Sequence, residues 1–311
     1  MSTFNLSLNH HLDLPDDVFR LMRDQIYKRT GMWFSDTSKY LLQKRLSPRA
    51  RELNFDSFQK YFYFLQYDPR AEGEFDQIYD LVTTNETYFF REKSQLRALV
   101  GEILPEALVA RRERGSGPVS VWSAGCSSGE EPYSIVMLAR EAGFDPERDL
   151  RVYATDISRR MMKRARAGNY REGSFRETEP ALRAKYFEEK DGTWTISDSV
   201  KKCVDFIHLN LMDRSRVALL GVMDVIVCRN VMIYFDADTK REVIQTFENK
   251  LRPGAHLLLG HSESLINVSS GLELRHLKTD LVYRKPIPGF GRPDPWHTAA
   301  MRAIGDVERS R

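Results

Sequence analysis

One stretch, residues 119–134, constrains the fold of this chain more than any other. Residues 119–124 predict a buried strand, and residues 132–140 have the composition of a helix. Between them, Gly125 and Gly129 allow a tight turn and a close approach of the backbone to a ligand. α/β proteins bind nucleotides with such a strand, glycine turn and helix. An ordinary loop with two glycines would look the same, so the stretch alone leaves both interpretations open.

Beyond this stretch the sequence alternates between strand-like and helix-like segments. The alternation predicts a doubly wound, mostly parallel α/β sheet that binds its ligand at the carboxyl ends of the strands. The predicted strands are Val119–Ala124, Leu150–Thr155, Val204–Leu209, Val222–Cys228, His256–Leu259, Leu272–Leu277 and Leu281–Arg284. The predicted helices between them are Tyr133–Glu141, Ser158–Ala167, Arg214–Ala218 and Asp238–Leu251.

Three further parts are expected around this sheet domain, which we place at residues 83–286. Residues 1–82 predict a small all-helical domain, with a first helix capped by Asp16 and ended by Gly31 and a second capped by Ser35 or Asp36. Residues 168–202 are too long for a strand-to-helix connection and predict a small antiparallel β insertion that turns at Asp191-Gly192. Residues 287–311 predict a mobile tail.

The second predicted helix carries a concentration of positive charge. Leu42 and Leu46, with Leu41 beside them, predict its buried stripe. A solvated helix face and a docking surface for an acidic partner both explain such a charge run. The candidate docking residues are Lys39, Arg45, Arg49 and Arg51.

Composition excludes several classes of protein. No apolar run among the 311 residues approaches the roughly 20 that a membrane-spanning helix needs. Residues 1–14 do not resemble a signal peptide, and the three cysteines have no paired spacing, so we expect a cytoplasmic protein without a disulfide framework or a bound metal. A net charge of +3 is too small to predict a nucleic-acid partner.

The residues around the glycine turn indicate the kind of ligand. Glu130 and Glu131 lie at the predicted helix start, where carboxylates would repel the pyrophosphate of a dinucleotide. The same carboxylates accept hydrogen bonds from amines and hydroxyls. Asp156 ends the next predicted strand, where it suits the two hydroxyls of a ribose. A cationic nucleoside without phosphate, such as S-adenosylmethionine, fits this set better than NAD does.

Four runs of residues carry a family resemblance. They are TNETYFFR at 84–91, WSAGCSSGEEPYS at 122–134, ATDIS at 154–158 and CRNVMIYF at 228–235. Together they resemble the CheR-type chemotaxis receptor methyltransferases over roughly residues 14–285. The resemblance implies a Rossmann-like class I S-adenosylmethionine-dependent methyltransferase domain. It also implies an enzyme that methylates glutamate carboxylates of chemoreceptors during sensory adaptation and releases S-adenosylhomocysteine.

The resemblance also implies roles for individual residues. Arg91 and Tyr234 are expected to act on the incoming glutamate, Arg91 through its charge and Tyr234 by orienting the acceptor. A core aromatic is the alternative interpretation of Tyr234. Asn85, Thr87 and Arg91 are expected at the methionine end of the cofactor. The remaining expected cofactor contacts are Glu131 at the amino group, Asp156 at the ribose, Asn210 and Leu211 at the adenine, and Arg229 and Asn230 in the same pocket.

The expected mechanism follows from the charge of the acceptor. A glutamate carboxylate, with a reference pKa of about 4.3, is ionised at neutral pH, so no strong general base is needed. We therefore expect an in-line displacement in which the enzyme aligns the reacting groups and excludes water, without a covalent enzyme intermediate.

The expected partners are the glutamate-rich cytoplasmic helices of chemoreceptors. We expect the protein to be a monomer that is associated with the membrane only through these receptors. In part of this family the insertion also binds a peptide at receptor C-termini, and the sequence leaves that property open here.

Two rival hypotheses are a non-catalytic sensor of S-adenosylmethionine or S-adenosylhomocysteine and a methyltransferase for another acceptor. Enzymes that modify nucleic-acid bases often carry an Asn/Asp-Pro-Pro-aromatic motif after the fourth strand, and this chain has RNVM at 229–232 instead.

Overall fold

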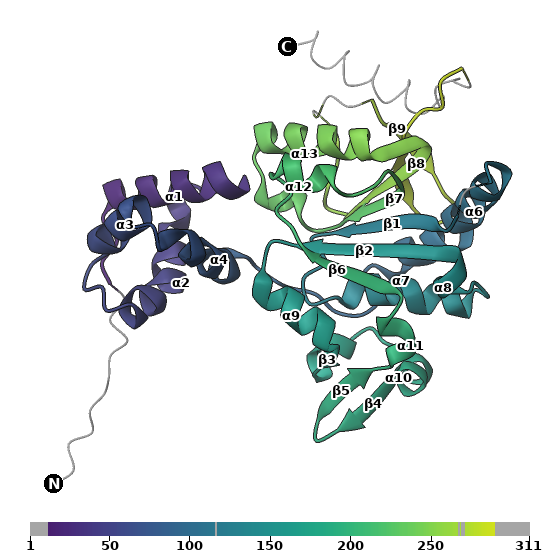
Figure 1. Ribbon diagram of the computed structural model, residues 1–311, viewed down its shortest axis with the longest axis horizontal. Coiled ribbons are helices and arrows are strands. Elements are labelled where there is room, and N and C mark those ends of the chain that lie inside the picture. The colour runs from purple at the N-terminus through teal and green to yellow at the C-terminus, as the bar shows by residue number, and fades with distance from the viewer. Residues whose placement is uncertain (1–11, 116, 267, 269–270, 290–311) are drawn as a thin grey trace. The chain divides into compact units, whose positions relative to one another are not determined.

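The structure is a computed structural model that describes residues 12–115, 117–266, 268 and 271–289 (Figure 1). The chain separates into two compact units, Met1–Thr84 and Asn85–Arg311, which we describe one at a time. Most of the predicted tail, residues 290–311, lies outside the described residues. Among the described residues, no helix has the length and apolar character needed to span a membrane.

The first unit is helical in its described part, as the sequence predicts. Its α-helices are α1 (Asp16–Thr30), α2 (Lys39–Glu52), α3 (Phe58–Tyr67) and α4 (Ala71–Val82), and a 3₁₀ turn, η1 (Asp36–Ser38), precedes α2. Gly31 ends α1 in the left-handed region, with a φ of 73°. The apolar stripes of the four helices form the core, which includes Phe19, Ile26, Leu42, Leu46, Phe58, Tyr61, Phe75 and Ile78.

Two details of the predicted helical unit are wrong, and a third is confirmed in part. Asp16 is the first residue of α1 rather than its cap, which is Pro15, and its carboxylate pairs with Lys39 at 2.5 Å. Ser35, one of the two predicted caps, occupies the N-cap position of η1, which runs directly into α2, and Ser38 is the cap position of α2 itself. Leu41 is exposed, because it points away from the stripe formed by its neighbour Leu42.

The second unit is built on a seven-stranded sheet in the order β6-β2-β1-β7-β8-β10-β9. The pairs β6·β2, β2·β1, β1·β7 and β7·β8 are parallel, and β10 is antiparallel to β8 and β9. The predicted doubly wound sheet is therefore confirmed. Its strands are β1 (Val119–Ala124), β2 (Leu150–Asp156), β6 (Val204–His208), β7 (Met223–Cys228), β8 (Leu251–Leu259), β9 (Glu273–His276) and β10 (Leu281–Arg284).

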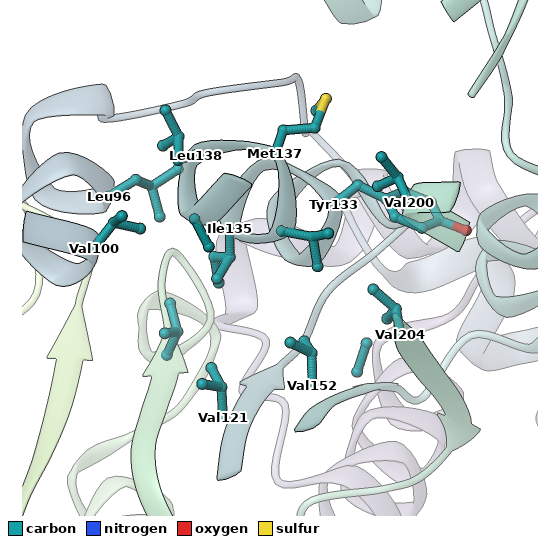
Figure 2. Packing of buried hydrophobic residues seen from close by; sticks show 14 of the residues in the cluster. Leu96, Val100, Val121, Tyr133, Ile135, Met137, Leu138, Val152, Val200 and Val204 are labelled. Atoms are coloured by element: carbon teal, nitrogen blue, oxygen red, sulfur yellow. The ribbon is translucent and has the colours of Figure 1, made fainter. Parts of the chain in front are cut away.

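Helices cover both faces of this sheet. Val121 of β1 packs with the buried side of α7 (Glu130–Glu141), as Figure 2 shows. The next residue, Trp122, points to the opposite face and contacts Phe247 of α13 (Ala237–Lys250), with ring centroids 5.2 Å apart. The other helical segments are α5 (Lys93–Ala98), a π-helical turn η2 (Leu99–Ile103), α6 (Leu104–Glu113), α8 (Pro146–Asp149), α9 (Arg159–Ala167), α12 (Arg214–Ala218) and η4 (Met232–Tyr234).

The insertion contains the predicted hairpin and a third strand that was not predicted. β4 (Phe187–Lys190) and β5 (Thr193–Ile196) pair antiparallel through Asp191 and Gly192, which both have positive φ, and β3 (Asn169–Tyr170) pairs with the other side of β5. β4 is thus an edge strand. The helical segments of the insertion are η3 (Glu172–Phe175), α10 (Pro180–Tyr186) and α11 (Asp198–Lys201).

Other differences from the predicted elements are local. Between α5 and α6 the backbone takes the π-helical turn η2, so residues 93–113 do not form one regular α-helix. α8 was missed because four residues are too few to show a helical period. β8 begins five residues before the predicted strand, which its Pro253 and Gly254 concealed.

One buried histidine predicts how stability depends on pH. His256 on β8 is 4% exposed, and burial together with Arg275 and Arg284 lowers its pKa from 6.5 to about 3. The unfolded chain binds a proton there below about pH 6.5, whereas the folded chain stays neutral. The free energy of unfolding should therefore fall by up to ~1.4 kcal/mol per pH unit as the pH drops from 6.5 towards 3.

Urea unfolding of His256→Gln between pH 6.5 and 5 tests this. The glutamine oxygen can accept the hydrogen bond that Arg275 Nη1 donates to His256 Nε2 at 2.7 Å, but the side chain does not titrate. We expect a shallower loss of stability in the variant. Equal slopes for the variant and the native chain would contradict the assignment.

Candidate functional site

The glycine turn after β1 is held by the neighbouring strand. The N–H groups of Gly125 and Cys126 both donate to the carbonyl oxygen of Thr155 on β2, at 2.8 and 2.9 Å. The next N–H, that of Ser127, donates to Asp156 Oδ2 at 2.8 Å. Ser127 has a φ of 49°, a conformation that is strained for a residue with a side chain. The end of β2 therefore sets the shape of the turn.

Both glycines of the turn are required by geometry. Gly125 and Gly129 have φ values of 80° and 94°, which side chains disfavour. A Cβ on Gly125 would lie 2.4 Å from Val231 Cγ2, in the loop that follows β7. A Cβ on Gly129 would lie 3.0 Å from Ala165 of α9. The loops after β1 and β7 thus meet at Gly125, at the carboxyl ends of the parallel strands.

Asp156 lies at the end of β2, as predicted, and is 8% exposed. In addition to Ser127, it accepts from the N–H of Ser158 at 2.8 Å, through Oδ1. The carboxylate therefore also has a structural role, which the sequence analysis did not assign to it. Both bonds come from backbone N–H groups, so the carboxylate is held in place at the edge of the sheet where the ligand was predicted.

Glu131 and Arg229 form a buried ion pair beside the turn. Arg229 Nε donates to Glu131 Oε2 at 2.8 Å, and the two side chains are 2% and 13% exposed. Ser123 Oγ donates to the other carboxylate oxygen of Glu131 at 2.7 Å. Arg229 Nη1 also donates to the carbonyl of Arg91 at 2.8 Å, so the structure brings these three predicted residues together.

Glu130, adjacent to Glu131 in α7, points elsewhere. Its carboxylate accepts from Ser128 Oγ at 2.9 Å and from Ser174 Oγ, in the insertion, at 3.2 Å. Burial raises the pKa of Glu130. Tyr170 of β3 donates its hydroxyl to the carbonyl of Ser128 at 2.8 Å. Glu130 therefore joins the glycine turn to the insertion, and of the two glutamates only Glu131 meets the other predicted ligand-binding residues.

The segment from Asn85 to Arg91 is also joined to both α7 and the insertion. Phe90 N–H donates to Ser134 Oγ at 2.9 Å, and Phe89 N–H donates to the carbonyl of Ser174 at 2.9 Å. Arg91 Nη1 donates to the carbonyl of Glu86 at 2.8 Å. Asn85, Thr87 and Arg91 are all partly exposed. This segment forms a wall whose position depends on the insertion.

The other predicted residues follow β6 and β7. Asn210 Oδ1 accepts from the N–H of Met212 at 3.0 Å, and Leu211 beside it is partly exposed. Asn230 has a φ of 60°, and Tyr234 ends the 3₁₀ turn η4. Because the sheet order places β6 beside β2 and β7 beside β1, these loops flank the glycine turn on its two sides.

Sequence reasoning missed Glu263, which holds the loop after β7. Its Oε2 accepts from the N–H groups of Asn230 and Gly260 at 2.7 and 2.8 Å, and its Oε1 accepts from Ile233 at 3.3 Å. Burial raises the pKa of Glu263, against the opposing effect of these N–H groups. A glycine at the end of a predicted strand, followed three residues later by a glutamate, is the sequence signal that was available.

Replacing Glu263 by glutamine should lower the free energy of unfolding by about 1–3 kcal/mol. The amide oxygen of glutamine can take the position that accepts from Asn230 and Gly260. Its NH₂ group then faces the N–H of Ile233, and two donors cannot form a hydrogen bond. Urea unfolding measures the loss. Glu248→Gln is the matched control, because Glu248 accepts one backbone N–H, from Gly271, at an exposed site. Equal losses in the two variants would contradict the role given to Glu263.

The predicted docking residues lie on α2, in the first unit, and most of them have partners there. Arg49 makes two bonds to the buried carboxylate of Glu74, at 2.8 and 2.6 Å, and that carboxylate also accepts from Tyr61 Oη. Arg45 donates to the carbonyl of Val82 and to Thr84 Oγ1, and Lys39 pairs with Asp16. Arg51 is exposed. Arg49 and Arg45 therefore stabilise the helical unit whatever else they do.

The polar groups gathered at the carboxyl ends of the strands suit one kind of ligand. Two carboxylates, those of Asp156 and Glu131, lie there with the guanidinium of Arg229 and several backbone amides, which matches a molecule that has an ammonium, a carboxylate and hydroxyls. Among the described residues, no group of three or more His, Cys, Asp or Glu side chains is placed to hold a metal ion.

Comparisons with known proteins give consistent results. The family model described as CheR methyltransferase, SAM binding domain, matches residues 85–280, and that described as CheR methyltransferase, all-alpha domain, matches residues 17–83. The chain is 37% identical to chemotaxis protein methyltransferase 2 of Vibrio cholerae over 278 residues, which is 89% of this chain and 95% of that protein. It is 35% identical to the chemotaxis protein methyltransferases of Borreliella burgdorferi (84% and 92% covered) and Escherichia coli (87% and 92% covered).

Proposed function

The chain belongs to the CheR methyltransferase family and is an S-adenosylmethionine-dependent enzyme, and on this premise we propose that it esterifies glutamate side chains of chemoreceptors. The observation that carries the proposal is the buried Glu131–Arg229 pair beside the glycine turn and Asp156. Such a site suits a cationic amino acid linked to a nucleoside, because Glu131 and Asp156 supply acceptors for an ammonium and for hydroxyls.

Each part of S-adenosylmethionine has a matching group in this chain. We assign Asp156 to the ribose hydroxyls, Glu131 to the amino group, and Arg91 with Asn85 and Thr87 to the methionine carboxylate. Asn210 and Leu211 are assigned to the adenine, and Arg229 and Asn230 complete the pocket. When bound, the cofactor supplies a methyl group activated by a positively charged sulfur.

The residues of the chain contribute position and electrostatics rather than a base. The acceptor carboxylate is ionised at neutral pH, so the protein need only orient it and exclude water. Tyr234 lies on η4, beside Asn230, where its hydroxyl is assigned to orienting the acceptor. Arg91 is assigned a second role, that of attracting the acceptor carboxylate by charge.

The proposed acceptors are the glutamate-rich cytoplasmic helices of chemoreceptors, and we propose that the enzyme acts on them in the cytoplasm as a monomer. Positive charge on α2 favours their approach and should matter most at low salt. Arg51, which is exposed, is better suited to this than Lys39, Arg45 and Arg49, whose charged groups are bound within the helical unit. The edge strand β4 is the proposed place for a receptor C-terminal peptide, which would add to the sheet.

Labelled S-adenosylmethionine tests the proposal directly. The protein is incubated with membranes that contain chemoreceptors, and with receptor-free membranes as the control, and the labelled protein is then treated with mild alkali. We expect receptor-dependent label that alkali releases as methanol, because methyl esters hydrolyse. Label that survives alkali would indicate another acceptor. Cofactor binding without any transfer would indicate a sensor that is not an enzyme.

A further inference from the structure

Helix α9 presents a strongly basic face that neither the sequence analysis nor the proposed site includes. Met161, Met162 and Ala165 form its buried side, and Tyr133 Oη donates to the carbonyl of Ala165 at 2.9 Å. No acidic residue occurs within the helix. The exposed residues Arg159, Arg160, Lys163, Arg164 and Arg166 form what we name the α9 basic face.

Helix stability does not explain this arrangement. Arg159 and Arg160 are the first two residues of α9, where the positive end of the helix dipole disfavours cations. By contrast, α1 begins with Asp16 and Asp17, in agreement with the dipole. A helix selected only for its own stability would carry acidic residues in its first turn and opposite charges four residues apart. Arg166 Nη2 donates to the carbonyl of Phe206 at 2.7 Å, whereas helix stability does not account for the exposed charge of Lys163 and Arg164.

The position of α9 relates this charge to the proposed active site. The helix packs against β2 and β6, and its cap, Ser158, lies two residues after Asp156 (Figure 1). Arg216 of α12 is a further exposed cation near the end of β6. Its Nη2 donates to the carbonyl of His208, the last residue of that strand. The first turn of α9 thus begins at the edge of the sheet where the cofactor is assigned.

We propose that the α9 basic face is a docking surface for the acidic helical segment that carries the acceptor glutamates. This inference rests on the proposed function and extends it, because it assigns part of acceptor recognition to the catalytic unit itself. The argument is one of charge complementarity: exposed cations beside the site attract a glutamate-rich helix and raise its rate of association.

Charge reversal on the exposed face tests the inference. In Arg160→Glu/Lys163→Glu, we expect kcat/KM for receptor-containing membranes to fall at least tenfold at 50 mM salt. The difference from the native enzyme should shrink at 300 mM salt, because ions screen exposed charges. The affinity for S-adenosylmethionine, measured by calorimetry, should stay within twofold. The matched control is Arg112→Glu/Arg114→Glu, an equal change at the end of α6, which leads to the start of β1.

Each other outcome overturns the inference. Equal losses in the α9 and α6 variants would indicate an effect of net charge alone. A loss of cofactor affinity or of folding stability would give the α9 basic face a role within the protein. Binding of a 20-base-pair DNA duplex that disappears in the α9 variant, with methylation unchanged, would assign the surface to nucleic acid. If the native enzyme transfers no label, the proposed function is overturned together with this inference. If the native and variant enzymes both label receptors normally, only this inference is overturned.

Discussion

Replacing Asp156 by alanine should weaken S-adenosylmethionine binding by roughly 10²–10⁴-fold. Hydrogen bonds to a charged group contribute about 1.5–3 kcal/mol each, and two ribose hydroxyls are assigned to this carboxylate. The loss should appear in calorimetry as a weaker affinity and in the methylation assay as a higher KM. Asp205→Ala is the control, because Asp205 is an exposed carboxylate on the neighbouring strand β6 that pairs with Arg151 at 3.5 Å.

The same carboxylate holds Ser127 and Ser158, so the experiment must separate a direct contact from a change in the glycine turn. An analogue of S-adenosylhomocysteine that lacks both ribose hydroxyls does this. If Asp156 binds the ribose, the substitution should weaken binding of the parent compound far more than binding of the analogue. Equal weakening of both would mean that Asp156 acts only through the turn.

Arg229→Met should lower the free energy of unfolding by about 3–5 kcal/mol, the range seen when one partner of a buried ion pair is removed. Glu131 would then remain as a buried carboxylate without its guanidinium. The carbonyl of Arg91 would lose its donor at the same time, so the Asn85–Arg91 wall should loosen. We expect cofactor binding to be lost along with the stability.

The double variant Arg229→Met/Glu131→Gln supplies the critical comparison. Because it removes both charges, it should regain part of the stability lost in the single variant, although not cofactor binding. Arg214→Met is the surface control: its pair with Glu242 spans 2.9 Å between exposed side chains and should contribute less than about 1 kcal/mol. If Arg229→Met is as stable as Arg214→Met, the role assigned to Arg229 is refuted.

Much of the site was predictable because local signals specify it. Gly125 and Gly129 marked the turn, and Asp156 followed a strand whose period was clear. The different orientations of Glu130 and Glu131 were not predictable, because adjacent helix residues point about 100° apart and the partner of Glu130 lies 44 residues away in the insertion.

Contacts between distant segments account for the other failures. Glu263 reaches Asn230 across 33 residues, and only the pairing of β7 with β8 brings them together. On α2 the sequence displayed the number of cations but not their partners, and Glu74, which binds Arg49, lies on another helix. The number of cations on α2 is therefore larger than the number whose charge is exposed to solvent.

The dependence of the glycine turn on β2 also has a kinetic consequence. The backbone bonds from Gly125 and Cys126 to Thr155 join residues about thirty positions apart, so the turn acquires its final shape only after β1 and β2 have paired. A ligand that needs this shape binds late in folding. The cofactor should therefore slow unfolding while leaving the rate of refolding nearly unchanged, since its contacts are absent from the transition state.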